Sequence, residues 1–435
     1  MQSVRFCQDG FGPGMTALAG SVAAIDTGVV ARPRRVLFVV NNAAFFESHR
    51  LPVAQRAQQR GYTVSLCTGH EASATLARHA MPRLAAAGLL PHRVAFRSAG
   101  VNPVFELLGL VQLILHVFRT RPDVLHCASP KGVLYGGIAA RLAGTPALVM
   151  AISGMGYAFT RGSGTTGTSG SGRDSLLRRL ARGVHQRLSG LAFGHANKRV
   201  IVQNDEDHRI LCESGLARPD EVRLIRGSGV ALNRFVYLPL VPPGGREPLV
   251  VLPARLLRDK GVVEFAEAAQ RVRAQVPGWR FVLVGTADYD NPSAVPLAQI
   301  QQWQQQGVLE WWGHVEDMAT LYGRAAVVCL PSYREGMPRA LLEAAAAGCA
   351  VVTTDVIGCR EAIEPGITGD LVPPHDAQAL AVALLALIHD APRRRRYGNA
   401  GRERAVRCFG IETILDDTLA LYEELLPRSA RHEAA

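Results

Sequence analysis

From Arg34 onwards, short apolar runs alternate with longer segments in which apolar residues recur every three or four positions. The short runs predict β-strands and the longer segments predict amphipathic helices. Strands are expected at Val36–Val40, Tyr62–Cys67, Arg93–Phe96, Val124–His126, Ala147–Ile152 and Arg199–Gln203. Helices are expected at Leu51–Arg60, Pro103–Phe118 and Gly132–Leu142, and a further helix after Cys67 is expected to end at about Ala87. This alternation favours a parallel sheet with helices on both faces.

A segment rich in Pro and Gly, Leu238–Pro248, has the composition of an interdomain linker. The alternation then restarts, with helices from Gly261 and Pro338 and strands at Leu249–Pro253, Arg280–Val284, Val308–Trp311, Val327–Leu330 and Ala350–Thr353. The fold class predicted is α/β, with two doubly wound Rossmann-like domains and a cleft at the carboxyl ends of their strands. The expected divisions are an N-terminal extension (1–32), a first domain (33–240), a second domain (241–409) and a C-terminal helix (410–435).

Composition narrows the class of protein. Of 435 residues, 48% are hydrophobic and 20% are charged, which excludes a disordered or fibrous chain. The longest uncharged run, Leu142–Thr160, is interrupted by Gly and Pro, so an integral membrane protein is not expected. Eight scattered cysteines form no CxxC pair, which argues against a disulfide framework and favours a reducing compartment. Residues 1–32 have only a weak apolar core, so a disordered tail is preferred to a signal peptide.

The net charge of +11 predicts anionic partners. The arginines are spread along the chain, so nucleic acid is not expected, whereas an anionic phospholipid surface would account for the charge. Phe105–Phe118 is apolar almost all round, which predicts a buried helix, with contact to lipid headgroups as the alternative. The Gly- and Ser-rich segment Arg161–Arg173 predicts a mobile loop over the cleft, and the arginines of Ser175–Leu191 predict a solvated or membrane-facing helix.

The stretch Leu330–Glu343 (LPSYREGMPRALLE) contains the most candidate functional residues. Pro338 follows a strand and a turn, where its fixed φ angle favours the start of a helix. The amides of Gly336, Met337 and the first helical turn would then form an anion site. Two carboxylates flank it, and they suit a ligand with hydroxyls as well as phosphate: Glu335 and Glu343. The alternative is that Glu335 caps the helix while Glu343 is an ordinary surface residue.

A second stretch, Pro253–Gly261, leaves the first strand of the second domain. Arg255 and Lys260 lie five residues apart across the strand-to-helix turn and could converge on a diphosphate at the same sheet edge. Lys260 is one of only three lysines beside 45 arginines, so a requirement for a compact ammonium is a reasonable hypothesis. The alternative is two solvated basic residues, with Lys260 paired to Asp259.

Together these two stretches resemble the retaining family-4 glycosyltransferases of GT-B fold, over residues from about Arg34 to Phe409. The resemblance implies that Arg255 and Lys260 neutralise the leaving diphosphate and that Glu335 contacts the hydroxyls of the donor sugar. It also implies that Glu343 holds the ribose and that the backbone of Gly336 and Met337 contacts sugar and phosphate. The donor would be a nucleotide-diphosphate sugar, expected to be a UDP-sugar, and no cofactor is implied.

The first domain resembles a narrower branch, bacterial enzymes that extend a sugar linked to polyprenyl diphosphate. The segments that carry this resemblance are Phe46–Pro52, Arg97–Pro103, His126–Gly132, Ile152–Tyr157 and Val202–Asn204. It implies a catalytic histidine near the donor sugar, His126, which the pattern puts at a strand end. It further implies an acceptor site with His49, Arg50 and Lys131, a cytoplasmic enzyme peripheral at the inner membrane face, and a C-terminal helix, Ile411–Leu425, that crosses back to the first domain.

The reaction implied is transfer of the sugar to an acceptor hydroxyl with retention at the anomeric carbon. Asp288-Tyr-Asp290 resembles the metal motif of a different glycosyltransferase architecture, but we interpret it as a turn and expect no metal. A nucleotide-sugar hydrolase or epimerase on the same fold, and a non-catalytic glycan-binding module, stay open as alternatives. A nicotinamide-dependent oxidoreductase is disfavoured because Asn41-Asn-Ala-Ala44, rather than a GxGxxG turn, follows the first strand.

Overall fold

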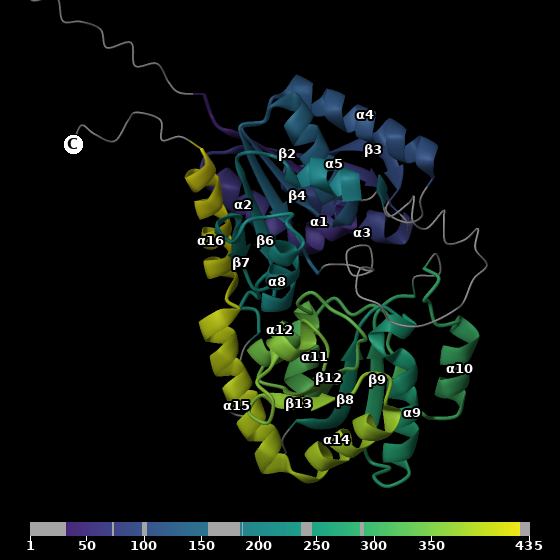
Figure 1. The fold of residues 1–435 in the computed structure, drawn as a ribbon. Helices are drawn as coiled ribbons and strands as arrows, with labels where there is room; N and C mark the ends of the chain where they lie inside the picture. The colour runs from purple at the N-terminus through teal and green to yellow at the C-terminus, as the bar shows by residue number, and fades with distance from the viewer. Residues whose placement is uncertain are drawn as a thin grey trace, which may run out of the picture. The chain divides into compact units, whose positions relative to one another are not determined.

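The computed structural model describes residues 32–71, 74–97, 102–154, 183–184, 186–235, 246–287 and 291–426. Two parallel sheets organise these residues, and helices flank both sheets (Figure 1). The part from Arg34 onwards forms one compact unit that contains both sheets. Several predicted segments lie wholly or largely outside the described residues: the N-terminal extension, the Arg161–Arg173 loop, the first part of Ser175–Leu191, most of the Leu238–Pro248 linker and Asp288–Asp290.

The first sheet has seven strands in the order β3-β2-β1-β4-β5-β6-β7, and all neighbouring strands are parallel. The strands are β1 (Arg35–Val40), β2 (Thr63–His70), β3 (Pro91–Arg97), β4 (Val124–Ala128), β5 (Ala147–Ala151), β6 (Lys198–Val202) and β7 (Val222–Leu224). The strand order reverses between β1 and β4. Ligands of doubly wound sheets bind in the crevice beyond the carboxyl ends of such a pair.

Side chains of β1 alternate between the two faces of this sheet, as expected for a strand buried on both sides. Val36 and Phe38 join a core with the helices Ala43–His49, Leu51–Gln59 and Ile411–Leu425, whereas Leu37 and Val39 join a core with the helices Pro103–Thr120 and Pro130–Ala143. The helical elements of this part are α1 (Ala43–His49), α2 (Leu51–Gln59), α3 (Ala74–Ala86), α4 (Pro103–Thr120), α5 (Pro130–Ala143), α8 (Asp205–Glu213) and the short η1 (Pro219–Glu221).

The second sheet has six strands in the order β10-β9-β8-β11-β12-β13, again all parallel. The strands are β8 (Glu247–Pro253), β9 (Arg280–Val284), β10 (Glu310–Trp311), β11 (Ala325–Leu330), β12 (Ala350–Thr354) and β13 (Gly369–Val372). Its helical elements are η2 (Arg258–Lys260), α9 (Val262–Arg273), α10 (Leu297–Gln305), α11 (Met318–Arg324), α12 (Arg339–Ala346), α13 (Cys359–Ala362) and α14 (Ala377–His389). The order reverses between β8 and β11, the two strands that precede the candidate motifs.

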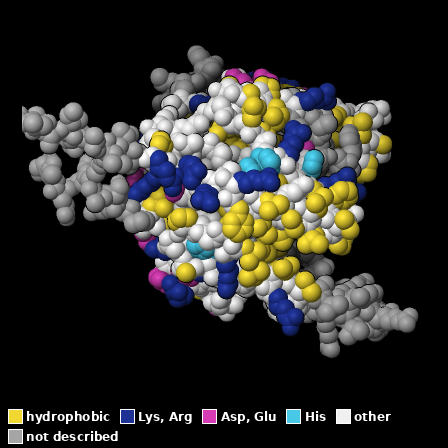
Figure 2. Space-filling view, turned by 90° about the horizontal axis from the view of Figure 1, so that it is seen from above, with side chains coloured by type: hydrophobic (Ala, Val, Ile, Leu, Met, Phe, Trp, Pro, Cys, Tyr) yellow, Lys and Arg dark blue, Asp and Glu magenta, His cyan; other side chains and the backbone are white. Residues whose placement is uncertain are grey.

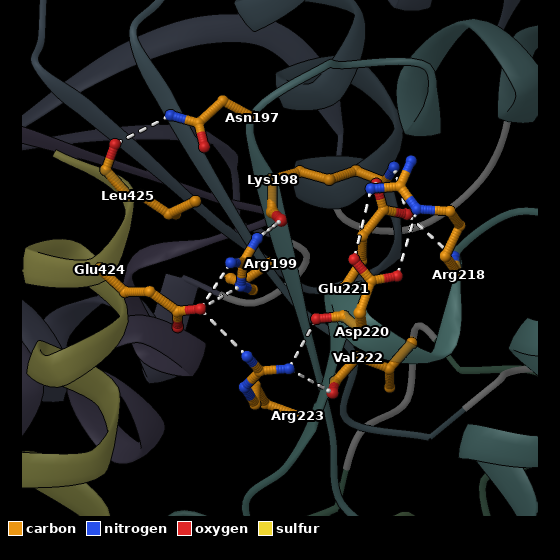
Figure 3. A network of polar contacts seen from close by, with 10 residues as sticks. All are labelled: Asn197, Lys198, Arg199, Arg218, Asp220, Glu221, Val222, Arg223, Glu424 and Leu425. Carbon is orange, nitrogen blue, oxygen red and sulfur yellow. Dashed lines mark hydrogen bonds and ion pairs between the residues drawn. The ribbon is translucent and has the colours of Figure 1, made fainter. Parts of the chain in front are cut away.

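Two C-terminal helices connect the sheets. α15 (Ala391–Cys408) packs on α12 and β12, and α16 (Ile411–Leu425) packs on α2, β5 and β6 of the first sheet. Figure 3 shows how the end of α16 is held: Glu424 pairs with Arg199 at 2.5 Å and with Arg223 at 3.0 Å, and Asn197 donates to the carbonyl oxygen of Leu425 at 2.9 Å. The last helix therefore belongs to the core of the first sheet.

The prediction of two doubly wound sheets is confirmed, and most predicted strands agree with the observed ones to within a few residues. Two local predictions are wrong. β4 continues to Ala128, so His126 lies in the middle of the strand and does not end it. The helix Pro103–Thr120 is not buried all round, because several of its large apolar side chains face solvent. The domain boundaries themselves stay a prediction.

Candidate active site

A cavity of about 280 Å³ lies at the carboxyl edges of the two sheets. Residues of both sheets line it: His49, Ser153, Gln203, Ser228, Pro253, Ala254, Arg255, Lys260, Leu330, Glu335, Gly336, Met337, Pro338, Arg339 and Ala340. Six of the ten residues that the sequence singled out are in this lining: His49, Arg255, Lys260, Glu335, Gly336 and Met337. The other four, which do not line it, are Arg50, His126, Lys131 and Glu343.

The two stretches of the second sheet meet directly in this cavity. The Nζ atom of Lys260 lies 2.5 Å from Oε1 of Glu335, and both side chains are largely buried. The hydroxyl of Ser332 donates to the same carboxylate oxygen at 2.7 Å. A carboxylate that receives two such hydrogen bonds is held in one position. The alternative pairing of Lys260 with Asp259 is not observed.

Close approach of the backbone explains how Lys260 reaches Glu335. Gly261 follows Lys260 with φ of +70°, and a Cβ atom there would lie 2.1 Å from the carbonyl oxygen of Pro331. Only glycine combines this φ with such contact. The start of α9 can therefore pack against the turn after β11, which carries Ser332 and Glu335.

The turn from β11 into α12 is the candidate anion site. Pro338 is the N-cap of α12, so the helix begins at Arg339, one residue after the predicted start. None of the described residues accepts a hydrogen bond from the amides of Gly336 and Met337. These amides, together with the positive end of the helix dipole, can bind phosphate or sugar oxygens. Glu343 lies deeper in α12, where burial raises the pKa of its carboxyl group and Arg339 pairs with it at 2.7 Å.

Glycine also brings the two sheets together at this edge. A Cβ atom on Gly336 would lie 2.3 Å from the carbonyl oxygen of Ser153, which follows β5. Asn204, the N-cap of α8, donates to the carbonyl oxygen of Gly336 at 3.2 Å. Arg339 donates to the carbonyl oxygen of Ser48 at 2.7 Å. The loop that would hold the donor sugar is therefore in contact with the first sheet at three points.

His49, at the end of α1, is the predicted residue of the first sheet region that lines the cavity. Its Nδ1 lies 2.7 Å from Oγ of Ser48, and that hydroxyl also donates to the carbonyl oxygen of Ala44 at 2.8 Å. Since a serine hydroxyl has one proton, this assigns the His49 proton to Nδ1 and leaves Nε2 as an acceptor. Burial and the charge of Arg50 lower the pKa of His49 to about 3, so the ring is neutral at physiological pH.

Arg50 and His126 lie behind the cavity lining. Burial lowers the pKa of Arg50 to about 10, and no carboxylate of the described residues lies within ion-pair distance of it. His126 is stacked on Phe38, and its Nδ1 lies 2.6 Å from the hydroxyl oxygen of Tyr422 on α16. Burial, followed by the charge of Arg50, lowers the pKa of His126 well below its usual value. Its ring holds α16 on the sheet and is not presented to the cavity lining.

Lys131, which the sequence assigned to the acceptor site, contacts other protein groups in the structure. Its Nζ lies 2.7 Å from Oε1 of Glu106 on α4 and 2.7 Å from the carbonyl oxygen of Arg97. The ammonium group therefore fastens α4 and β3 to the start of α5.

Sequence reasoning did not assign four polar lining residues: Ser153, Gln203, Ser228 and Arg339. Gln203 directly follows β6, and Ser153 comes two residues after β5. A position just beyond the carboxyl end of a parallel strand is typical of ligand-binding residues, so the sequence pattern could have indicated both. Arg339 is the first residue of α12 and directly follows Pro338, so its position was also visible. In the described residues, no group of three or more His, Cys, Asp or Glu side chains is arranged to hold a metal ion.

This cavity offers both cations and amides for phosphate and, a few ångströms away, a fixed carboxylate for hydroxyls. A nucleotide sugar carries both phosphates and hydroxyls, and glycosyltransferases are among the enzymes that bind one between two doubly wound sheets. The fold and the site fit a nucleotide-sugar-dependent glycosyltransferase.

Comparison with known proteins gives the family. Residues 247–390 match the model described as "Glycosyl transferases group 1", and residues 35–168 match that described as "Glycosyl transferase 4-like". The chain belongs to this family of group 1 (family 4) glycosyltransferases, with the GT-B fold.

Two curated relatives and one solved structure are similar over most of their length. The N,N'-diacetylbacillosaminyl-diphospho-undecaprenol alpha-1,3-N-acetylgalactosaminyltransferase of Campylobacter jejuni is 26% identical over 341 residues, which cover 76% of this chain and 85% of the relative. The UDP-Gal:alpha-D-GlcNAc-diphosphoundecaprenol alpha-1,3-galactosyltransferase of Escherichia coli is 24% identical, covering 75% and 81%. Anabaena Alr3699/HepE in complex with UDP and glucose superposes with a TM-score of 0.68 at 17% identity, covering 90% and 100%, which supports the fold.

Proposed function

We propose that this glycosyltransferase transfers a sugar from a UDP-sugar to a hydroxyl of a sugar linked to polyprenyl diphosphate, with retention at the anomeric carbon. We further propose that it acts as a cytoplasmic enzyme, peripheral at the inner face of the membrane. The observation that carries the proposal is the ion pair of Lys260 and Glu335, 2.5 Å apart in a cavity that Arg255 also lines. The printed activities of the Campylobacter and Escherichia relatives support the lipid-linked acceptor.

Donor binding uses the second sheet. Arg255, Lys260 and the amides of Gly336 and Met337 would contact the diphosphate, while Glu335 would accept hydrogen bonds from sugar hydroxyls. Lys260 serves both groups, because its ammonium would neutralise the departing phosphate and holds the Glu335 carboxylate in position. The carboxylate of Glu343 is paired with Arg339. To contact the ribose, it would have to break this ion pair or accept a ribose hydroxyl in addition to it.

The chemical step breaks the bond between the anomeric carbon and the phosphate oxygen and forms a bond to the acceptor oxygen on the same face. The acceptor proton passes to the leaving phosphate oxygen, so no protein base is needed. The cations and amides act where negative charge develops, and such preorganised groups are each worth about 2.7–4 kcal/mol in the transition state.

The acceptor would enter from the first sheet. Nε2 of neutral His49 can accept a hydrogen bond from the acceptor hydroxyl and so orient it, although a group with a pKa near 3 is too weak to deprotonate it. Arg50, which has no carboxylate partner among the described residues, would contribute positive potential to the acceptor phosphate from behind His49. Lys131 would do the same only by exchanging Glu106 for that phosphate. His126 is then a positioning residue for α16.

The test is an assay of purified full-length protein with a panel of UDP-sugars and a short-chain prenyl-diphosphate-linked N-acetylhexosamine, with the product linkage read by NMR. We expect acceptor-dependent UDP release and an α-linked product from an α-configured donor. UDP release at the same rate without acceptor would favour the hydrolase alternative, and a β-linked product would overturn retention.

A further inference from the structure

The helix α4 exposes an apolar face to solvent. Val104 is 71% exposed and Leu107 is 64% exposed. The whole face, called here the apolar face of α4, consists of Val104, Phe105, Leu107, Leu108, Val111, Leu115 and Phe118. These residues recur at helical spacing and form one stripe along the helix. Among the described residues, α4 is the one helix whose length and composition would allow it to cross a membrane.

Contacts on the inner side prevent α4 from turning this stripe towards the core. Glu106 is buried, with Lys131 at 2.7 Å from one carboxylate oxygen and the hydroxyl of Tyr135 at 2.6 Å from the other. Gly109 faces β3 so closely that a Cβ atom there would lie 2.5 Å from the amide nitrogen of Phe96. Rotating or extracting the helix would expose Glu106 to an apolar phase without its partners, which is strongly unfavourable. The apolar face is therefore a fixed outer surface, and α4 cannot span a bilayer.

Basic side chains accompany this face. The exposed arginines at this face are Arg97, at the end of the neighbouring β3, and Arg119 and Arg121, at the C-terminal end of α4. The guanidinium of Arg97 lies 5.5 Å from the centre of the Phe105 ring. The single acidic residue of α4, Glu106, points inward. Figure 2 shows hydrophobic side chains gathered in one broad area of the surface that carries α4, with Lys and Arg side chains at its borders.

We propose that the apolar face of α4 docks on an anionic lipid bilayer, with the helix lying flat at the level of the headgroups. Apolar side chains would enter the acyl boundary, while the three arginines contact lipid phosphates. At 1.5 Å per residue the helix presents about 27 Å of this face. A second copy of the chain is a poorer occupant, because an isologous contact would bring two sets of these arginines together without carboxylates between them.

The choice of a bilayer as occupant rests on the proposed function, in which the acceptor is lipid-linked. The docking surface, however, consists of residues outside the cavity lining. Binding to lipid and transfer of sugar can therefore be measured separately.

The experiment is flotation of the purified full-length protein with vesicles of phosphatidylcholine alone and with vesicles that also contain phosphatidylglycerol. We expect binding to the anionic vesicles. The double variant Leu107→Asp, Leu115→Asp should lower the partition coefficient about tenfold or more, since two exposed apolar side chains become charged. The double variant Arg97→Gln, Arg119→Gln should lower it about fivefold per arginine on anionic vesicles only.

The matched control is Val382→Asp, Val406→Asp, which changes two equally exposed apolar residues on α14 and α15. It should leave flotation unchanged. Equal loss in this control, or vesicle binding by the α4 variant at the parental level, would overturn the proposal. So would a parental dimer in sedimentation that only the α4 variant dissociates. A protein that transfers sugar to a detergent-solubilised acceptor but never floats contradicts the docking surface alone, and one that floats through α4 without transferring sugar contradicts the proposed function alone.

Discussion

The carboxyl edges of the two sheets carry candidate residues of similar kinds, but they use them differently. At the second sheet Arg255, Lys260 and Glu335 all line the cavity, and two of them are in contact. Of the four residues predicted at the first sheet only His49 lines it, while His126 binds α16 through Tyr422. The two edges have the same topology, so topology alone does not bring a residue to the ligand.

The difference lies in where each residue stands relative to its strand. Lys260 and Glu335 are in turns after β8 and β11, and glycines with special backbone geometry hold those turns together. Such turns project beyond the sheet whatever packs on its faces. His126 lies inside β4, where side chains alternate between faces, and the face it takes is covered by α16.

The largest expected effect is at the second edge. Lys260→Ala should lower kcat/KM for sugar transfer about 10²- to 10³-fold, because the leaving phosphate loses a preorganised cation. Arg255→Ala should behave similarly. Arg258→Ala, an exposed residue of the same 3-10 turn, is the control and should stay near the parental rate. Initial rates with saturating acceptor measure this, and a Lys260→Ala enzyme with parental activity would remove the mechanism proposed for this edge.

A smaller loss is expected for Glu335→Gln, about 10- to 100-fold in kcat/KM, since a charged hydrogen-bond acceptor becomes neutral while its shape is kept. Lys260 would also lose its partner. The control is Glu310→Gln, which breaks an ion pair with Arg280 outside the cavity lining. If both variants lost activity equally, the effect would be one of stability and not of the donor site.

At the first edge, Tyr422→Phe should destabilise the protein by about 1–3 kcal/mol, because a buried ring nitrogen of His126 loses its hydrogen bond. The KM for the donor should change little. Urea unfolding and donor titration measure the two quantities, with the half-buried Tyr62→Phe as the milder comparison. A large rise in the donor KM without loss of stability would instead put His126 in the donor site.

The effect that is smallest at neutral pH, because it appears only on acidification, comes from His49. The pKa of His49 is about 3 in the folded protein, against 6.5 for a free histidine, so the unfolded chain binds the proton first on acidification. Stability should fall as pH decreases from 6.5 towards 3, and above pH 6.5 this group contributes no pH dependence. His49→Asn should make that fall shallower by up to one proton. An unchanged slope between pH 6.5 and 4 would contradict a neutral buried His49.

Most strands of the fold and the main elements of the candidate donor site could be predicted from the sequence alone. Periodicity located most strands of both sheets, and the spacing of Arg255, Lys260, Glu335 and Pro338 across strand-to-helix turns predicted a phosphate and hydroxyl site. These features depend on local geometry, since a parallel strand followed by a turn and a helix presents its turn at the carboxyl edge in any doubly wound sheet.

Features that depend on contacts between distant segments of the chain became known only from the tertiary structure. The pairing of Lys131 with Glu106, the contact of His126 with Tyr422 and the outward direction of the apolar face of α4 each join segments far apart in the chain. An almost uniformly apolar helix has no periodicity from which to read its buried side. For α4, a buried carboxylate and a glycine in contact with β3 determine which side faces the core, and neither partner can be identified from the helix sequence itself.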